Sequence, residues 1–299
     1  MFITIQNFSN VYFEQPFMKT LHNLAAENDT DDKVCWLDCS QIAGTDCYCD
    51  DCAVEEIKKL MNESSSTAQN AAEIESTTPE IHFFDNGNYH YMSKLWTDRI
   101  TVPFTLVVFD HHPDMQPPRF GDILSCGGWI KKVLEENKFV QNVVIIGVAD
   151  HLIEELQADE TAEFAKYKDR VTFIPESEIR EWQNCKQKST TPQLSYSSLV
   201  CSLPKASVLS SNIYFSIDKD ALAPSEAATN WDQGSLTFET MTAIISELAR
   251  DRNILGIDIC GERAQEFNPI ENGAQTAQDA DELNNKLNQE LVEFLRCEV

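Results

Sequence analysis

Short apolar runs rich in β-branched residues alternate with amphipathic stretches along this chain, and this alternation restricts the fold more than any other feature. The five clearest runs are TLVVFD (105–110), NVVIIGVAD (142–150), RVTFIP (170–175), NIYFSID (212–218) and NILGIDI (253–259). Such runs are typical of strands buried on both faces of a parallel sheet. Segments between them, such as GGWIKKVLEENKF and LTFETMTAIISELARD, have helical periodicity. The pattern predicts a three-layer α/β/α sandwich with a mostly parallel central sheet.

The whole chain, residues 1–299, is predicted to form one α/β domain. Its hydrophobic content of 42% is sufficient for a large core, and no shift in composition forces a boundary. The opening MFITIQNFSNVYFEQPF contains two short alternating runs around a turn, which predicts a strand pair integrated into the domain. Near the C-terminus, Leu283, Leu287 and Leu291 recur at helical spacing and predict a docked amphipathic helix.

The charge balance restricts the partners of this chain. It contains 49 Asp and Glu against 23 Lys and Arg, a formal net charge of −26. This excess argues against nucleic acid and anionic membrane surfaces as partners. The N-terminus has no basic region followed by an apolar one, and no run of about 18 apolar residues occurs. We therefore expect a cytoplasmic protein that acts on a small molecule.

Five of the ten cysteines lie between Cys35 and Cys52. In a long chain without a signal peptide, reduced thiols are expected rather than a disulfide framework. The CYCDDC end has a spacing that suits a zinc ion, although no second pair of ligands follows at the usual distance. Two other interpretations remain open, namely small buried apolar side chains and a reactive loop beside an active site.

Two of the predicted strands end in clusters of ionisable residues. In VVFDHHPDMQ, Asp110, His112 and Asp114 are spaced two apart, so an extended chain turns their side chains to the same side. In NIYFSIDKDAL, Asp218 and Asp220 have the same spacing. Because ligands of parallel sheets bind beyond the carboxyl ends of the strands, these five side chains are expected to share one patch.

This set of side chains predicts a metal centre. Carboxylates with few imidazoles and no thiolate favour manganese or magnesium over a purely structural zinc. Five or more ligands exceed the needs of one catalytic zinc and suit two ions that share carboxylates. A water bridging the two ions would attack a polarised carbon or phosphorus centre. The structural alternative is that the aspartates serve only as turn and N-cap residues, and the occurrence of both motifs together argues against it.

The two motifs resemble those of the arginase/ureohydrolase family. DHHPD resembles the family's Asp-x-His-x-Asp motif, and SIDKDALAP resembles its Ser-x-Asp-x-Asp-x-x-x-Pro motif, in the same order. The resemblance covers roughly residues 80–265 and implies an arginase/deacetylase-like fold with two manganese ions, zinc and iron(II) being alternatives. It also implies that His90, in GNYHYMS, is a further metal ligand and that the protein forms a homo-oligomer, as is common in the family.

Two further residues are candidates for a catalytic role. GIDICGE resembles the family's Asp-x-x-Glu segment, which implies that Glu262 faces the guanidinium group of the substrate. Glu262 comes one residue later than the pattern requires, so either a bulge at Gly261 returns it to the pocket or it serves a different substrate. The loop after Asp114 lacks the family's proton-shuttling histidine. His151, which opens a helix after a predicted strand, is either a replacement shuttle or a residue near solvent.

These departures from the family pattern predict a ureohydrolase-like hydrolase that cleaves a C–N bond in a guanidine, amidine or amide other than arginine. A deacetylase-like enzyme with a single metal at Asp110, His112 and Asp218 is the rival within the enzyme class. The rival from another class is a non-catalytic binding module stabilised by metal. The intact Asp114 and Asp220 argue against the single-metal enzyme, because one ion has less need of them. The missing loop histidine is the best support for the binding module, and the retained set of metal ligands argues against it.

Overall fold

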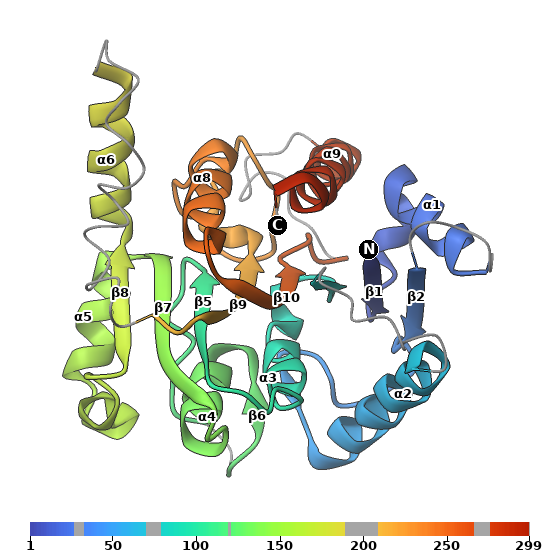
Figure 1. Cartoon of the computed structure of the whole chain (residues 1–299), viewed down its shortest axis with the longest axis horizontal. Coiled ribbons are helices and arrows are strands. Elements are labelled where there is room, and N and C mark those ends of the chain that lie inside the picture. Colours follow the sequence, from blue (N-terminus) through green and yellow to red (C-terminus); the bar gives the residue numbers. More distant parts are fainter. Residues whose placement is uncertain (27–32, 70–78, 119–120, 189–208, 266–275, 299) are drawn as a thin grey trace.

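The computed structural model describes residues 1–26, 33–69, 79–118, 121–188, 209–265 and 276–298 (Figure 1). Within these residues the central sheet has eight strands in the order β2-β1-β4-β10-β9-β5-β7-β8, and neighbouring strands are parallel. Their bounds are β1 (Phe2–Asn7), β2 (Lys33–Asp38), β4 (Glu80–Phe83), β5 (Phe104–Phe109), β7 (Val140–Val148), β8 (Val171–Pro175), β9 (Asn212–Asp218) and β10 (Asn253–Cys260).

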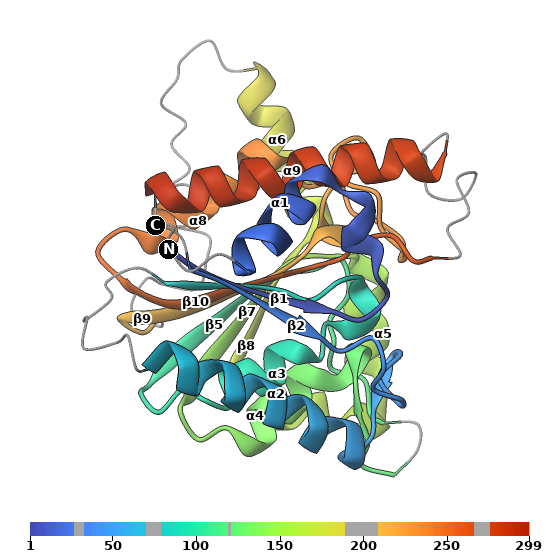
Figure 2. The ribbon, with the colours of Figure 1, turned by 90° about the vertical axis from the view of Figure 1, so that its right-hand side faces the viewer.

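Helices cover both faces of this sheet (Figure 2). On one face lie α1 (Pro16–Ala25), α6 (Glu176–Lys188), α8 (Phe238–Ala249) and α9 (Ala277–Glu298). On the other lie α2 (Asp51–Gln69), α3 (Met92–Thr97), α4 (Trp129–Glu136) and α5 (Asp150–Ala158). The buried apolar side chains accordingly form two clusters, one on each side of the sheet. This arrangement confirms the predicted three-layer α/β/α sandwich.

Short elements connect these layers. They are the 3₁₀ helices η1 (Val11–Glu14), η2 (Gly87–Tyr89), η3 (Cys126–Gly128), η4 (Glu160–Ala162), η5 (Phe164–Lys166) and η6 (Lys219–Ala221), and the strands β3 (Tyr48–Cys49) and β6 (Leu124–Ser125). The last two form a separate antiparallel pair. Several of these elements border the carboxyl ends of the sheet strands, where the functional residues are expected.

The five strands predicted from apolar runs are all present, as β5, β7, β8, β9 and β10. Every residue of β5 is buried, as are the last six residues of β7. Continuous burial is what a strand covered by helices on both faces requires, and it explains why these sequences are apolar without alternation.

The predicted strand pair at the N-terminus is wrong. Only its first run forms a strand, β1, which lies between β2 and β4 in the central sheet. Asn10 adopts a left-handed backbone with φ 67°, and the second run then forms η1. Pro16 occupies the first turn of α1, a position that its fixed φ and missing N–H favour. The N-terminal residues are nevertheless part of the same sheet that carries the functional residues.

The C-terminal helix is docked as its leucine spacing predicts. Leu287, Leu291 and Leu295 are buried in the cluster shared with α1 and α8. The same face of α9 also buries Asn284 and Asn288, which have no measurable exposure. Buried amides require hydrogen-bond partners, and theirs are described below because they involve Glu262.

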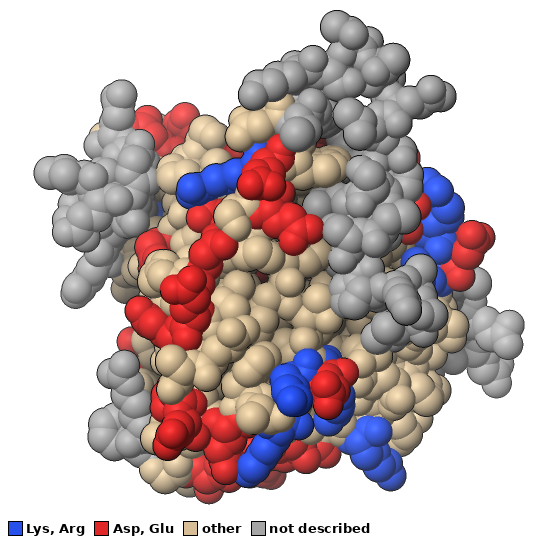
Figure 3. All heavy atoms as spheres, turned by 90° about the vertical axis from the view of Figure 1, so that its left-hand side faces the viewer, with Lys and Arg blue, Asp and Glu red and all other residues tan. Residues whose placement is uncertain are grey.

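The acidic excess of the sequence is visible on the surface. Figure 3 shows the side formed by α5, α6 and β8, where Asp and Glu form a band and Lys and Arg gather near its lower edge. Several acidic residues of α5 are exposed, including Glu154 and Glu155. Among the described residues, no helix combines the length and the apolar character needed to cross a bilayer.

Candidate metal centre

The carboxyl ends of β5 and β9 lie side by side, and the predicted ligands follow directly. Phe109 of β5 pairs with Ile217 of β9, so Asp110 and Asp218 are the next residues along two adjacent strands. On the other side of β9, Cys260 at the end of β10 pairs with Asp218. Parallel pairing therefore brings segments more than 100 residues apart to one edge of the sheet.

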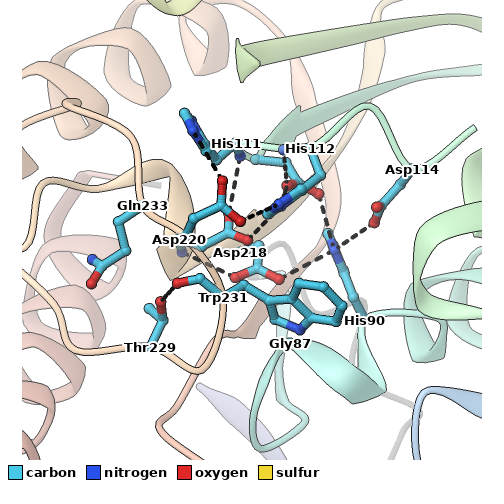
Figure 4. A network of polar contacts seen from close by, with 12 residues as sticks. Gly87, His90, His111, His112, Asp114, Asp218, Asp220, Thr229, Trp231 and Gln233 are labelled. Carbon is cyan, nitrogen blue, oxygen red and sulfur yellow. Dashed lines mark hydrogen bonds and ion pairs between the residues drawn. The ribbon is translucent and has the colours of Figure 1, made fainter. Parts of the chain in front are cut away.

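His90 lies at the centre of the first group of these side chains (Figure 4). Its Nδ1 lies 3.2 Å from Oδ2 of Asp110, 3.1 Å from Oδ2 of Asp114 and 3.4 Å from Oδ2 of Asp218. Its Nε2 lies 2.9 Å from Oγ of Ser216. A proton on Nε2 that is donated to this hydroxyl leaves the Nδ1 lone pair directed at the three carboxylates.

His112 lies in a second group beside the first. Its Nδ1 is 2.9 Å from Oδ2 of Asp220 and 3.5 Å from Oδ1 of Asp110, and its Nε2 is 3.2 Å from Oδ1 of Asp232. The donor atoms of Asp110, His112 and Asp220 all lie within 4.8 Å of one another. Asp110 belongs to both groups, which is the arrangement expected of a carboxylate shared by two cations. The structure thus brings all six predicted ligands together.

The six side chains fit divalent cations. Nδ1 of His90 and Oδ2 of Asp110 are buried and have no hydrogen-bond partner. Four carboxylates surround two imidazoles, so two negative charges stay uncompensated when all four carboxylates are ionised and both rings are protonated. An uncompensated buried charge is costly, and a metal ion removes the cost. The oxygen and nitrogen donors match those of hard and borderline divalent ions.

Without metal, this cluster takes up protons. Burial and the neighbouring Asp110 raise the pKa of Asp114 to about 7. Burial and Asp218 raise the pKa of Asp220 well above its usual range. Burial disfavours charge on the two imidazole rings, but the surrounding carboxylates raise the pKa of both. Because a cation must displace these protons, metal binding is expected to strengthen as the pH rises.

A pocket of about 270 Å³ opens onto the cluster. Its other walls are formed by Cys47, Tyr48, Gly87, Pro113, Gln116, Pro117, Ser125, Cys126, Gly127 and Trp231. Trp231 follows η6 and packs edge-on against His112, with 5.6 Å between the ring centres. Its Nε1 donates a hydrogen bond to Oδ1 of Asn88 at 3.0 Å. The indole is thereby held in place at one side of the pocket.

The cysteine-rich segment Cys35–Cys52 borders this pocket. Cys47 lines it together with Cys126, whose N–H donates to the carbonyl oxygen of Cys47 at 2.9 Å. Cys39 and Cys49 are instead buried among apolar side chains. The groups of metal-competent side chains found in the described part of the chain contain no cysteine from this segment. The structure therefore favours roles in packing and in the pocket wall over a zinc site.

Glu262 does not lie where the family pattern predicts. It is absent from the pocket lining, and its side chain is completely buried. Its carboxylate accepts hydrogen bonds from four side chains, Gln15 (2.8 Å), Asn284 (2.9 Å), Asn288 (2.8 Å) and Lys219. These donors come from the connection before α1, from α9 and from η6. Glu262 therefore joins the sheet to the helices above it rather than facing a substrate.

Gly261 explains this position. The backbone does turn there, as the sequence suggested, with a φ of +93°. The turn directs Glu262 into the protein interior, where Asn86 and Glu262 form an isolated bridge and the N–H of Glu262 donates to the carbonyl oxygen of Asp85. A left-handed φ is strained for residues other than glycine, so the turn depends on Gly261.

Replacing Gly261 with alanine should destabilise the protein. Its Cβ would overlap with Oδ1 of Asp218 and would lie 2.6 Å from the backbone nitrogen of Lys219. The left-handed backbone and the overlap together predict a loss of about 3 kcal/mol in the free energy of unfolding, measured with urea. Gly121→Ala is the control, because Gly121 also has a positive φ but its Cβ would contact nothing within 4 Å. Equal losses in both variants would contradict this explanation.

His151 also lies away from the pocket. It is exposed on α5 and does not line the pocket. A neighbouring groove is lined by Leu152, Glu155, Leu156 and Asp159, which share one face of the helix. His151 comes one residue before Leu152, the first residue of this face. Because successive residues of a helix are rotated by about 100°, the side chain of His151 points away from the groove. Of the two interpretations of His151 given by the sequence, a replacement proton shuttle or a residue near solvent at the start of a helix, the structure favours the second.

Several side chains that contact the predicted ligands were not found from the sequence. Nε1 of Trp129 donates to Oδ2 of Asp114 at 2.7 Å. Sγ of Cys260 donates to Oδ2 of Asp218 at 3.3 Å, and the two form with His90 a third group of metal-competent side chains. A signal for Cys260 existed, because it follows the predicted strand 253–259 directly and so lies at the edge of the sheet where ligands bind.

Known proteins resemble this chain in both sequence and fold. Residues 90–287 match the arginase family. A Thermotoga maritima protein is 28% identical over 193 residues, which is 64% of this chain, and the match spans only 62% of that relative's length. The matched range begins at His90 and contains all six predicted ligands together with Cys260 and Glu262.

Solved structures extend the comparison to the fold. An agmatine ureohydrolase of Thermoplasma volcanium is similar with a TM-score of 0.60 and 13% identity, covering 99% of this chain and 89% of its own. An arginase from Bacillus subtilis has a TM-score of 0.55 and 15% identity, covering 96% and 98%. A formiminoglutamase of Trypanosoma cruzi with Mn²⁺ has a TM-score of 0.56 and 13% identity, covering 96% and 91%.

Proposed function

This chain belongs to the arginase family, and from that premise we propose that it is a metal-dependent hydrolase that cleaves a C–N bond in a small molecule. The observation that carries this proposal is a pair of buried atoms in the carboxylate cluster, Nδ1 of His90 and Oδ2 of Asp110, which lie 3.2 Å apart and make no hydrogen bond. Such atoms are rare in protein interiors and are expected where a cation completes their contacts. The cluster also borders a pocket that can admit a substrate.

Two divalent ions suit the two groups of side chains. The first would be held by His90, Asp110, Asp114 and Asp218, and the second by Asp110, His112 and Asp220. Manganese fits a set dominated by carboxylates, and the Trypanosoma cruzi formiminoglutamase with this fold contains Mn²⁺. When bound, such ions supply a nucleophilic water and polarise the group that it attacks. The remaining contribution comes from the chain itself, which holds and orients the substrate.

The pocket favours a planar cationic or neutral substrate group. Apart from the four carboxylates that would hold the two ions and be offset by their charge, the lining residues that the structure describes include no other carboxylate and neither lysine nor arginine. Trp231 offers an aromatic surface, and Gln116 and Ser125 offer polar side chains. These features suit a guanidinium, amidinium or amide group better than an anion. Neighbours named for agmatine, arginine and formiminoglutamate share the fold, so the fold itself does not select among them.

We propose a substrate other than arginine. Glu262, the residue that the family pattern assigns to the guanidinium group, is buried and fully occupied by four donors. His151, the candidate replacement for the missing shuttle histidine, lies away from the pocket. A substrate that needs neither a carboxylate from Glu262 nor a proton from His151 fits the positions of these two residues better. Release of ammonia or urea from a panel of guanidines, amidines and amides identifies it.

The metal content of the purified protein tests the centre. We expect two manganese ions per chain by elemental mass spectrometry after incubation with manganese and removal of excess. Asp114→Ala should lose the ion on the His90 side, and Asp220→Ala should lose the ion on the His112 side, because each removes a ligand from one group. Zinc retained by both variants would indicate binding elsewhere, for example at Cys47 or Cys52, and would contradict the proposed centre.

The same measurements separate the rival functions. One ion per chain that depends on Asp110 and His112, but not on Asp114, would indicate a single-metal enzyme of the deacetylase type. Two bound ions without turnover of any compound in the panel would indicate a binding module. The two groups of side chains, which share Asp110, favour two ions.

A further inference from the structure

Cys260 is a buried thiol placed directly against the metal centre. It ends β10, pairs in register with Asp218 and is 1% exposed. Its Sγ lies 3.3 Å from Oδ2 of Asp218 and donates a hydrogen bond to it.

A second observation indicates that this thiol lies beside a position that a metal ion could occupy. Nδ1 of His90, which is buried without a hydrogen-bond partner, lies 3.4 Å from the same Oδ2 of Asp218. The donor atoms of His90, Asp218 and Cys260 all lie within 4.8 Å of one another. Bonds of about 2.0 Å to nitrogen or oxygen and about 2.3 Å to sulfur fit a group of this size.

Resting on the proposed function, we propose that Cys260 is an additional protein ligand on the His90 side of the centre and makes that position selective for a thiophilic ion. Binding would break the S–H bond, release the proton to solvent and form a metal–sulfur bond, without a change of oxidation state. Thiolate ligands favour zinc, iron(II) or cobalt over manganese.

The two positions of the centre then differ in chemistry. The group of Asp110, His112 and Asp220 contains oxygen and nitrogen donors alone, which suit manganese. The group around His90 adds a sulfur atom. Where both kinds of ion are supplied, the protein would therefore hold a mixed pair, with the thiophilic ion next to β10 and the harder ion next to His112; manganese supplied alone would occupy both positions. An apolar residue at position 260 would make the two positions similar.

Cobalt(II) is the probe, because a cobalt–thiolate bond gives a charge-transfer absorption in the near ultraviolet that carboxylate and imidazole ligands do not give. We expect titration of the metal-free, full-length protein with cobalt to produce this band. Cys260→Ser should lose the band. Its zinc affinity should fall by roughly 100-fold, because losing a direct ligand should cost at least as much as the largest losses seen on removing a residue that only supports a ligand. Its manganese affinity at the His112 position should change by less than about tenfold.

Cys126→Ser is the matched control, since Cys126 is a pocket thiol that belongs to none of the metal-competent groups found among the described residues. It should keep the full band. A band that persists in Cys260→Ser, or that disappears in Cys126→Ser, overturns the proposal. X-ray absorption of the unaltered protein with one equivalent of zinc needs no variant, and should show one sulfur at about 2.3 Å.

The outcomes also separate this inference from the proposed function. Two bound cobalt ions that depend on Asp110 and Asp220, but give no thiolate band, would leave the hydrolase centre intact and refute the role of Cys260. Failure of cobalt to bind in a manner that depends on these aspartates would refute the centre itself, and the Cys260 proposal with it.

Discussion

Asp220→Ala is expected to abolish hydrolysis while leaving the chain folded. Oδ2 of Asp220 lies 2.9 Å from Nδ1 of His112, and Oδ1 accepts a hydrogen bond from the N–H of His111 at 2.9 Å. Loss of this carboxylate removes one of the three side chains in the second group, so the water-activating ion is lost with it. Turnover of the identified substrate should fall by at least roughly 1,000-fold, measured as initial rate of ammonia or urea release.

The free energy of unfolding of the metal-free protein tests independently whether Asp220 serves the metal centre or the fold. Burial and Asp218 raise the pKa of Asp220 well above its unfolded value, so the metal-free parent loses stability as the pH rises through the folded pKa. Asp220→Ala lacks this group and should be at least as stable as the metal-free parent near pH 8. With metal at 100 times its dissociation constant, the parent should gain about 2.7 kcal/mol for each of its two sites, and Asp220→Ala should gain this amount only for the site on the His90 side.

Glu154→Ala is the control for both measurements, because Glu154 is an exposed carboxylate on α5 outside the pocket lining. Its turnover, metal content and stability should equal those of the parent. Unchanged turnover in Asp220→Ala would refute the metal centre as the source of activity. A large loss of stability in the metal-free variant would show instead that Asp220 acts as a structural turn residue.

Lys219→Met is expected to cost about 3–5 kcal/mol of unfolding free energy, the range for removing one partner of a buried ion pair. Lys219 and Glu262 are both completely buried and their charged groups are in contact. Without the lysine, the carboxylate retains its amide donors, Gln15, Asn284 and Asn288, but loses its counter-ion. Urea denaturation at pH 7 measures the loss.

The double variant Lys219→Met/Glu262→Met should be less destabilised than the sum of its single variants, since it leaves no unpaired charge. The matched control is Lys286→Met, which makes the same substitution in an exposed pair with Glu290 on α9. That change should cost less than about 1 kcal/mol. Equal effects of Lys219→Met and Lys286→Met would contradict the structural role of the buried pair.

A further variant, Glu262→Gln, tests whether Glu262 contacts the substrate or stabilises the fold. If Glu262 faced the substrate, Glu262→Gln would lower turnover and leave stability nearly unchanged. From its position between Lys219 and the asparagines of α9, we expect the opposite. The stability should fall by about 3 kcal/mol or more, while turnover per folded, metal-loaded molecule should stay within about threefold of the parent.

The fold was predictable in its central part because local pattern and tertiary environment coincide there. Strands β5, β7, β9 and β10 are buried along most of their length, and such burial selects continuous apolar runs that are visible in the sequence. The edge strand β8 is only partly buried, but its run of Val, Thr, Phe and Ile is visible as well. Strand β4 has only four residues, and β2 has a single buried residue. These two strands were not identified from the sequence, whereas β1 was identified as a strand but was paired with the wrong segment.

Five of the six predicted ligands could be placed at the sheet edge from the sequence pattern for a related reason, while the prediction for His90 rested on the family resemblance. Asp110 and Asp218 stand at two strand ends, and His112 and Asp220 come two residues after them, as the alternation of an extended chain requires. Asp114 keeps the same spacing in the sequence, but its backbone is not extended and has a φ of 45°. What the chain order could not reveal is where a side chain points after an irregular residue. Gly261 has a φ of +93° and turns Glu262 away from the pocket.

The sequence by itself therefore determined the layered sheet, its carboxyl edge and the side chains gathered there, because strands encode their burial and their alternation locally. The tertiary structure alone decided which neighbours those side chains have. Cys260 lies beside Asp218 because β10 pairs with β9, and Glu262 contacts Gln15 across 247 positions of the chain because helices pack over the sheet. Contacts between segments so far apart depend on packing, which no local pattern records.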